Sequence, residues 1–180
     1  MALRDQIDSL LSDAAASGDV PGVVATATDR NGTLYEGGFG LRVLGGAAPM
    51  TPDTVVWIAS MTKALTATGA MQLVERGKLA LDDPASAVVP ALGDVAVLDG
   101  FDADGRPRTR APRRPITLRH LLTHTAGFSY EIWSEPIQLC QAALGLPGII
   151  TCQNAALRTP LLFDPGERWE YGISIDWVGK

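Results

Sequence analysis

The pattern of apolar and polar positions predicts a helix followed by an antiparallel hairpin at the start of the chain. Between residues 3 and 14, apolar side chains recur at helical spacing, and Gly18 follows as a stop signal. Residues 20–28 are mostly β-branched or small, and residues 33–41 form a similar run. Because Asn31-Gly32 lies between them, and Asn-Gly favours tight turns, we expect the two runs to pair.

Residues 54–74 are mostly apolar and contain a single charged side chain, Lys63. A membrane span is the first alternative, but six polar side chains and a central lysine argue against it. A lysine at mid-bilayer costs about 3 kcal/mol. A helix that is apolar nearly all round is instead buried inside a globular protein. We therefore expect a buried helix that ends at the charged, glycine-containing residues 75–78.

The stretch from residue 99 to residue 115 is polar and holds five arginines and three prolines. A nucleic-acid-binding arm is one interpretation, but three aspartates are interspersed and no aromatic residue that could stack on bases lies among the arginines. A solvated surface loop is favoured. After it, Thr117 is placed to cap a short helix, and Gly127 follows soon after that helix should end.

Composition and charge narrow the class of protein. The chain is 46% hydrophobic and 19% charged, which is ordinary for a globular protein. Its net charge of −5 argues against general affinity for nucleic acid or anionic membranes. The first ten residues include acids where a secretory signal needs an apolar run, so we predict a cytoplasmic protein. Cys140 and Cys152 fit neither a zinc site nor a disulfide scaffold.

Ser60 and Lys63 are the candidate reactive pair, because residues three apart share one face of a helix. A serine hydroxyl is a weak nucleophile until a neighbouring group takes its proton. Burial disfavours a charged lysine and lowers its pKa, which would make it a usable base. S-x-x-K alone is a weak signal, and a lysine that extends to the surface from the start of the helix is the structural alternative.

Three separate segments give the pair a wider context. S-M-T-K at 60–63 is followed by A-M-Q-L-V-E-R-G-K-L-A-L-D-D-P at 70–84, then by I-T-L-R-H-L-L-T-H-T-A-G-F at 116–128 and P-G-E-R-W-E-Y-G-I-S at 165–174. In this order they resemble the serine β-lactamase and penicillin-binding-protein family. The likeness is greatest to its class C enzymes and to the family VIII carboxylesterases, and it covers nearly all of the chain from about Val20 onward.

The resemblance assigns roles to individual residues. Ser60 would be the acylated nucleophile, and its backbone N–H would supply half of an oxyanion hole. Lys63 and Tyr171 would form the proton-transfer pair. Tyr130 and Trp133 are candidates to line an acyl pocket, with burial as core aromatics the alternative. His120 and His124 lie four apart, which is a spacing that can bind metal, but no third ligand is evident and the resemblance makes them structural.

The resemblance also implies a fold and shows what the chain lacks. The expected fold is α+β, β-lactamase/D,D-peptidase-like, with an antiparallel sheet flanked by helices. Within one catalytic unit over 1–180, we expect the helix, hairpin and nucleophile helix in 1–74, a mostly helical region in 75–165 and the second motif in 166–180. The family's third motif, K-T-G or its esterase counterpart, does not occur. A second polypeptide or a missing C-terminal segment is therefore expected to complete the fold.

The function expected from the resemblance is hydrolysis of small carboxylic esters through a Ser60 acyl-enzyme, without metal or cofactor. Lactamases usually carry Y-x-N at the second motif, whereas Tyr171 is followed here by Gly172 and Ile173, which favours a carboxylesterase. The alternatives are a β-lactamase or D,D-peptidase, an acyltransferase that uses an alcohol in place of water, and a non-catalytic binding module derived from the fold. The absent third motif keeps the binding module open.

Overall fold

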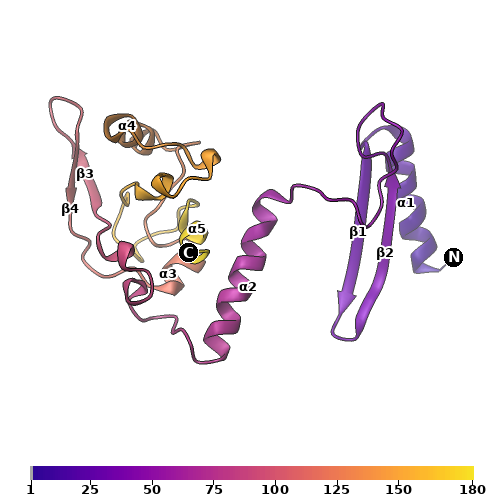
Figure 1. Cartoon of the computed structure of the whole chain (residues 1–180), viewed down its shortest axis with the longest axis horizontal. Coiled ribbons are helices and arrows are strands. Elements are labelled where there is room, and N and C mark those ends of the chain that lie inside the picture. The colour runs from indigo at the N-terminus through magenta and orange to yellow at the C-terminus, as the bar shows by residue number, and fades with distance from the viewer. Residues whose placement is uncertain (1) are drawn as a thin grey trace. The chain divides into compact units, whose positions relative to one another are not determined.

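A helix and a two-stranded hairpin form the first unit of the chain, which ends at Trp57 (Figure 1). In the computed structural model, which describes residues 2–180, α1 spans Leu3–Ser17, β1 spans Gly22–Asp29 and β2 spans Gly32–Gly40. Gly18 ends α1 in the left-handed conformation, with φ of 83°. The predicted helix and hairpin are both confirmed.

The turn of this hairpin differs by one residue from the expected one. Asp29 pairs with Gly32, so the two loop residues are Arg30 and Asn31 rather than the Asn-Gly pair. The Asp29 carboxylate accepts hydrogen bonds from the backbone N–H groups of Asn31 at 2.7 Å and of Gly32 at 3.1 Å. An aspartate that bonds the backbone two residues on organises a turn by itself, which accounts for the shift.

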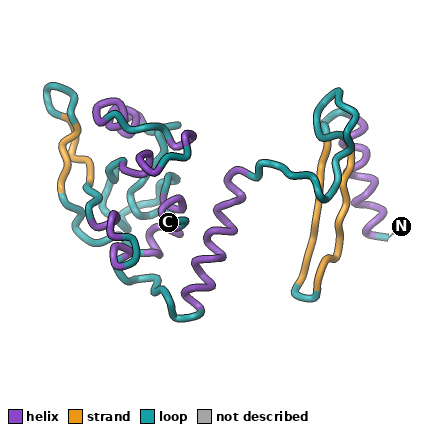
Figure 2. The backbone as a smooth tube through the Cα atoms, viewed as in Figure 1, coloured by secondary structure: helices purple, strands orange, loops and turns teal. Residues whose placement is uncertain are grey.

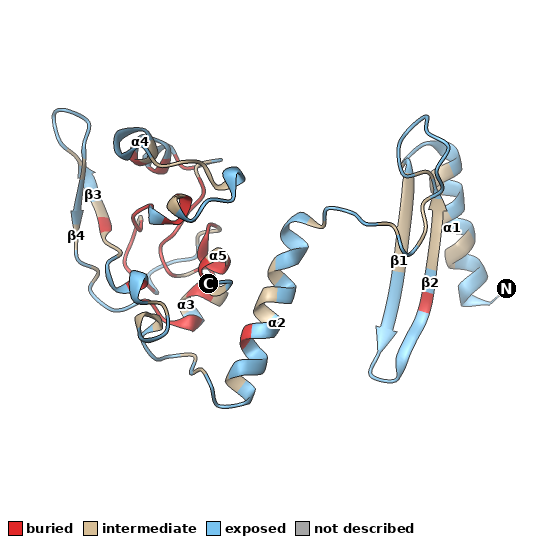
Figure 3. Cartoon of the chain, viewed as in Figure 1, coloured by how far each residue is buried: buried red, intermediate tan, exposed pale blue. Residues whose placement is uncertain are grey.

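One aromatic side chain ties α1 to the hairpin. Tyr35, on β2, is the single buried side chain in the described residues 2–57 (Figure 3). Its hydroxyl donates a 2.7 Å hydrogen bond to the Asp8 carboxylate, and the Arg4 guanidinium lies 5.5 Å from its ring centre. Both partners belong to α1, so this cluster fixes the helix along the strands.

The second unit, Ile58–Lys180, begins with the nucleophile helix. A 3₁₀ turn at Ala59–Met61 leads into α2, which spans Thr62–Glu75. Residues 54–58, which precede this turn, are irregular, because β-branched side chains there and a positive φ at Ala59 disfavour a helix. No helix within residues 2–180 is long and apolar enough to cross a membrane.

Only part of the expected burial of α2 is present in the residues that the structure describes. Ala70 is the one buried residue of α2, whereas Leu65, Met71 and Leu73 are exposed (Figure 3). The helix packs against α5, which spans Ser174–Val178. Cover from that short helix protects one side of α2 and leaves apolar side chains on its other faces in solvent.

Between α2 and α5 the chain alternates short helical turns with irregular backbone (Figure 2). Two α-helices, α3 over Leu118–Leu122 and α4 over Glu135–Leu144, are separated by a long irregular stretch. Thr117 caps α3 as expected, accepting a hydrogen bond from the backbone N–H of His120. Four 3₁₀ turns complete this region: Ala85–Ala87, Pro90–Gly93, Ile149–Thr151 and Asn154–Arg158.

The polar stretch expected as a surface loop instead contains a second hairpin. Strand β3 spans Val97–Phe101 and pairs antiparallel with β4 at Pro107–Arg110. The Asp102 carboxylate accepts hydrogen bonds from two backbone N–H groups of the turn, those of Asp104 at 3.0 Å and Arg106 at 2.8 Å. This side-chain bonding makes a compact turn from residues whose composition alone indicates a loop.

The core of the second unit gathers apolar side chains from many short elements. The aromatic rings of Phe128 and Trp177 stack at its centre, 6.1 Å apart. Figure 3 shows the buried residues concentrated around α3 and α5. The cluster consists of Leu92, Val97, Ile116, Leu121, Ala126, Phe128, Tyr130, Leu157, Leu161, Ile173 and Trp177. The architecture is α+β, as expected, with helices and two small antiparallel sheets in the described residues.

A buried carboxylate anchors the arginine-rich stretch to this core. Asp164 is 1% exposed and accepts two hydrogen bonds from the Arg110 guanidinium, at 3.0 and 2.7 Å. The backbone N–H of Arg113 donates a third, at 2.8 Å. These bonds, with the Arg110 guanidinium the largest cause, lower the pKa of Asp164 to about 2. The carboxylate therefore stabilises the fold while it is ionised.

Asp164→Asn should destabilise the whole protein above about pH 4, the ordinary pKa of aspartate. The ionised carboxylate contributes fully above that pH, and its contribution is lost as the pH falls toward the folded pKa of about 2. Urea midpoints at pH 7, 5, 4 and 3 should differ from wild type by a constant amount at first, and by less at pH 3. Asp82→Asn, which breaks an exposed pair with Arg119, should have a smaller effect. A difference that grows toward pH 3 would contradict this account.

Candidate active site

Ser60 lies where the irregular entry segment becomes α2. It is exposed, at the centre of the 3₁₀ turn Ala59–Met61 that precedes the first residue of the helix. Ala59, directly before it, has φ of 45°, in a region that side chains other than glycine rarely occupy. Backbone strain of this kind concentrates at functional positions, where the surrounding structure holds it in place. The serine hydroxyl is thus presented to solvent at a helix start.

The structure brings together all three residues expected to be catalytic. The Lys63 ammonium donates to Ser60 Oγ at 3.3 Å, from one turn further along the helix. The Tyr171 hydroxyl donates to the same oxygen at 3.2 Å, although 111 residues separate it from Ser60. Two proton-bearing groups therefore converge on one hydroxyl oxygen. A nucleophile flanked by groups that can exchange protons is the arrangement that serine acyl transfer needs.

Backbone pairing places Tyr171. The stretch that follows α3 runs beside the segment that leads to Tyr171, and Gly166 N–H donates to Thr125 O at 2.7 Å. Glu170 N–H donates to His124 O at 2.9 Å, directly before the tyrosine. The T-H-T-A-G-F and P-G-E-R-W-E-Y stretches, which the sequence analysis connected only by resemblance, thus hold each other through their main chains.

Aromatic rings surround Tyr171 on several sides. The ring of Tyr130 meets it edge-on at 5.5 Å, and that of Trp133 stacks on it at 5.7 Å. Both residues expected to line an acyl pocket therefore contact the site: Tyr130 is buried and Trp133 is half exposed. His124, at 4.8 Å, and Trp169, at 6.4 Å, also pack on the Tyr171 ring. Neither His124 nor Trp169 was expected at the site from the sequence.

The charge of Lys63 acts directly on these rings. Its Nζ lies 5.5 Å from the ring centre of Tyr171 and 5.7 Å from that of Tyr130, within the range of cation–π attraction. The pKa of Tyr171 is lowered, chiefly by its hydrogen bond with Ser60 and further by Lys63, while burial and the Asp176 carboxylate oppose the shift. Tyr171 therefore gives up its proton more readily than an ordinary phenol.

The two histidines lie in different surroundings. His120 Nδ1 accepts a hydrogen bond from the backbone N–H of Thr117, within its own helix. His124 has φ of 54°, packs on Tyr171 and has no hydrogen-bond partner for Nδ1 within residues 2–180. Burial lowers its pKa, and the positive charge of Lys63 adds to the effect. Over the described residues, no group of three or more potential ligands is placed to hold a metal ion.

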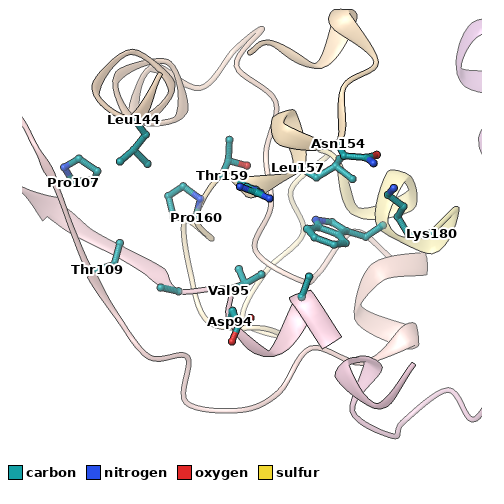
Figure 4. Close-up of a pocket in the computed structure, with 14 residues that line it drawn as sticks. Asp94, Val95, Pro107, Thr109, Leu144, Asn154, Leu157, Thr159, Pro160 and Lys180 are labelled. Carbon is teal, nitrogen blue, oxygen red and sulfur yellow. The ribbon is translucent and has the colours of Figure 1, made fainter. Parts of the chain in front are cut away.

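A separate cavity of about 520 Å³ lies on another part of the second unit (Figure 4). Apolar side chains such as Val95, Leu144 and Leu157 line most of it, and Asp94 and Lys180 are among its polar residues. None of the three converging residues contributes to its walls. It is therefore distinct from the surface around Ser60.

Comparison with known proteins identifies the family of the chain. The Beta-lactamase family profile matches residues 7–174. The chain therefore belongs to the Beta-lactamase family. Within it, the solved structure of unliganded simvastatin synthase (LovD) from Aspergillus terreus superposes with a TM-score of 0.84 at 36% identity, covering 99% of this chain and 47% of that protein.

Two curated relatives are equally similar in sequence and differ in activity. Acyltransferase mokF of Monascus pilosus is 37% identical over 97% of this chain and 44% of its own length. Lovastatin esterase of Penicillium rubens is also 37% identical, over 97% of this chain and 45% of its own length. The chain thus spans less than half the length of the curated relatives it matches, and these relatives are acyl-transferring enzymes.

Gly172→Ala should disrupt the site, because a Cβ at this position would lie 2.4 Å from Ser129 Cα and 2.7 Å from Phe128 O. Both are main-chain atoms that cannot give way, so the adjacent Tyr171 must move. We expect reaction of Ser60 with a fluorophosphonate probe, measured in the whole protein, to slow by about 10²-fold. Gly69→Ala, in α2 with open space around it, is the matched control and should react normally. Equal rates for the two variants would show that this close contact does not place Tyr171.

Proposed function

We propose that the whole protein is a serine hydrolase that cleaves small carboxylic esters through an acyl-enzyme on Ser60. The observation that carries this proposal is the convergence of Lys63 Nζ and Tyr171 Oη on Ser60 Oγ, at 3.3 and 3.2 Å. A binding module has no need for two proton-bearing groups on an exposed serine. Two such groups can take the proton from a serine nucleophile and return it to a leaving group.

In the first half-reaction, Tyr171 is ionised: Ser60 Oγ attacks the ester carbonyl carbon, and the Ser60 proton passes to the Tyr171 phenolate oxygen. The lowered pKa of Tyr171 suits this role, since its phenolate is stabilised by the Lys63 ammonium. The negative charge on the carbonyl oxygen faces the backbone N–H of Ser60 at the helix start, where the dipole is positive. The tetrahedral species then expels the alcohol, which takes the proton from Tyr171.

In the second half-reaction, a water molecule attacks the acyl carbon and gives its proton to the Tyr171 oxygen. The bond between that carbon and Ser60 Oγ breaks, and Oγ regains the proton as the carboxylic acid leaves. No group is consumed over the cycle. The exposure of Ser60 is consistent with access by water.

The second motif supports esters over β-lactams as substrates. Where lactamases carry the asparagine of Y-x-N, this chain carries Ile173, which is 2% exposed and belongs to the hydrophobic core. No side-chain amide can contact a lactam substituent from that position. An ester lacks this requirement, because its recognition depends on the acyl chain and the carbonyl group.

Transfer of the acyl group to an alcohol is the second candidate function. Acyltransferase mokF and lovastatin esterase match this chain at the same identity, so overall similarity does not separate the two outcomes. The exposed faces of Trp133 and Trp169, which stack with Tyr171, offer an apolar surface to which an acceptor alcohol could bind. Water and alcohol would then compete for the same acyl-enzyme.

Residues outside this chain are needed to complete the proposed site. The third motif of the family is absent from the chain, and the relatives are about twice as long. One backbone N–H at Ser60 is half of an oxyanion hole, and a single such donor is worth about 3 kcal/mol in the transition state. We propose that the second donor comes from a segment or polypeptide beyond these 180 residues.

Ser60→Ala should abolish both fluorophosphonate labelling and hydrolysis of p-nitrophenyl esters by the whole protein. The physical reason is that no other group forms the acyl-enzyme. Peptide mapping by mass spectrometry should locate the label at Ser60 in the parent. Ser129→Ala, which removes a hydroxyl bonded to Glu170, is the control and should retain the label. A label on another serine would refute the assignment.

Short-chain p-nitrophenyl esters should be better substrates than a chromogenic cephalosporin, because Ile173 replaces the amide of lactamases. We expect kcat/KM to be at least about tenfold higher for the ester, a difference of about 1.4 kcal/mol in transition-state binding. Adding an alcohol to the ester assay and measuring the transfer product by chromatography separates esterase from acyltransferase. A cephalosporin value equal to or above the ester value would place the protein among the lactamases.

A further inference from the structure

A carboxylate on α5 lies beside the site. Asp176 is five residues after Tyr171, in the first turn of α5, and is partly buried. Its Oδ2 accepts a hydrogen bond of 3.2 Å from the hydroxyl of Tyr130, 46 residues earlier in the chain. This contact joins α5 to the stretch that follows α3, close to the point where both contribute to the surroundings of Ser60.

Tyr130 connects this carboxylate to both groups that donate to Ser60. Its ring meets the Tyr171 ring edge-on at 5.5 Å, and Lys63 Nζ lies 5.7 Å from its centre. The side chain is 6% exposed, so its hydroxyl needs a partner within the protein. Asp176 supplies that partner and thereby fixes the Tyr130 ring, which Lys63 and Tyr171 both contact.

We propose that Asp176 is a positioning residue of this site, which holds Tyr130 through its hydrogen bond and places a negative charge beside the pair that exchanges protons with Ser60. The inference rests on the proposed function, since it concerns the pair that exchanges protons with Ser60. The hydrogen bond and the electrostatic effect have different requirements. The hydrogen bond needs an acceptor at Oδ2, whereas the electrostatic effect needs the ionised carboxylate.

The charges that face Tyr171 come from three parts of the second unit. Lys63 on α2 lowers the pKa of Tyr171, and Asp176 on α5 raises it. His124 and Tyr130, both from the stretch that follows α3, complete the set. Burial lowers the pKa of His124, so its ring is neutral near pH 7. Burial, with Asp176 adding to it, raises the pKa of Tyr130 well above its ordinary value, which keeps its hydroxyl a donor.

Other carboxylates near these segments have different partners. Glu131 accepts a 2.7 Å hydrogen bond from the backbone N–H of Ile149. Glu170 accepts a 2.9 Å hydrogen bond from the hydroxyl of Ser129. Asp176 is therefore the carboxylate placed to act on the pair at Ser60.

Two substitutions in the whole protein separate the charge from the hydrogen bond. Asp176→Asn keeps an acceptor and removes the charge, so the acid limb of the kcat/KM profile should move to lower pH as Tyr171 ionises more easily. Tyr130→Phe keeps the charge and removes the bond, so kcat should fall about tenfold or more through misplacement, with the acid limb unchanged. Asp104→Asn, an exposed aspartate in the β3–β4 turn, matches the charge change and should leave both quantities unaltered.

A spectroscopic readout distinguishes failure of this inference from failure of the proposed function. Phenolate absorbance is titrated in the parent and in Asp176→Asn, and each curve is compared with the same protein carrying Tyr171→Phe, which isolates Tyr171. We expect Tyr171 to ionise at lower pH in Asp176→Asn, whether or not any ester is hydrolysed. A shifted titration without turnover in the parent would refute the function and support the positioning.

The inference is overturned if Asp176→Asn and the parent share both the acid limb and the Tyr171 titration. Where Asp176→Asn does not fold, Asp176→Glu keeps the charge and displaces the acceptor. That variant should lower kcat while leaving the acid limb in place. Unchanged kcat in both Asp176→Glu and Tyr130→Phe would equally overturn the positioning role.

Discussion

The close main-chain contact between Gly172 and the stretch Phe128–Ser129 is the constraint on which the site depends. A side chain at position 172 would meet backbone atoms within 2.4–2.7 Å, so glycine is required for the two segments to approach. Because of that approach, Tyr171 lies over the start of α2 and Ile173 enters the core beside Phe128. The same contact thus positions a reactive phenol and buries an apolar neighbour. This coupling makes the site a consequence of core packing in the second unit.

The charged groups of the site lie around Ser60 Oγ and the two tyrosine side chains beside it. A single ammonium, that of Lys63, faces two phenols, and a single carboxylate, that of Asp176, bonds one of them. Lys63 and Asp176 act on the pKa of Tyr171 in opposite directions, beside the larger effects of the Ser60 hydrogen bond and of burial. Fixed charges of this kind need no rearrangement when charge develops in a transition state, which is the source of their catalytic value.

The sequence predicted those parts of the fold that local chemistry determines. The α1 stop at Gly18, the Thr117 cap and the hairpin follow from residue type and spacing, and the structure confirms each. The Ser60–Lys63 contact also followed from helical spacing. Its chemical role stays a prediction. The second hairpin was missed, because its turn depends on side-chain to backbone bonds of Asp102 that composition does not reveal.

Contacts between distant segments account for the remaining differences. His124 reaches the Tyr171 ring through tertiary packing, whereas Trp169 and Asp176 lie two and five residues from Tyr171 in the chain. No local pattern marks any of the three. For α2, an apolar sequence indicates a need for cover, but not which segment supplies it, and in the described residues α5 covers one side. Strain at Ala59 is likewise invisible in a sequence, since alanine there gives no sign of a positive φ. Packing around Ser60 must stabilise the strained backbone at Ala59. The same packing therefore stabilises the start of α2 and holds the Ser60 hydroxyl in place.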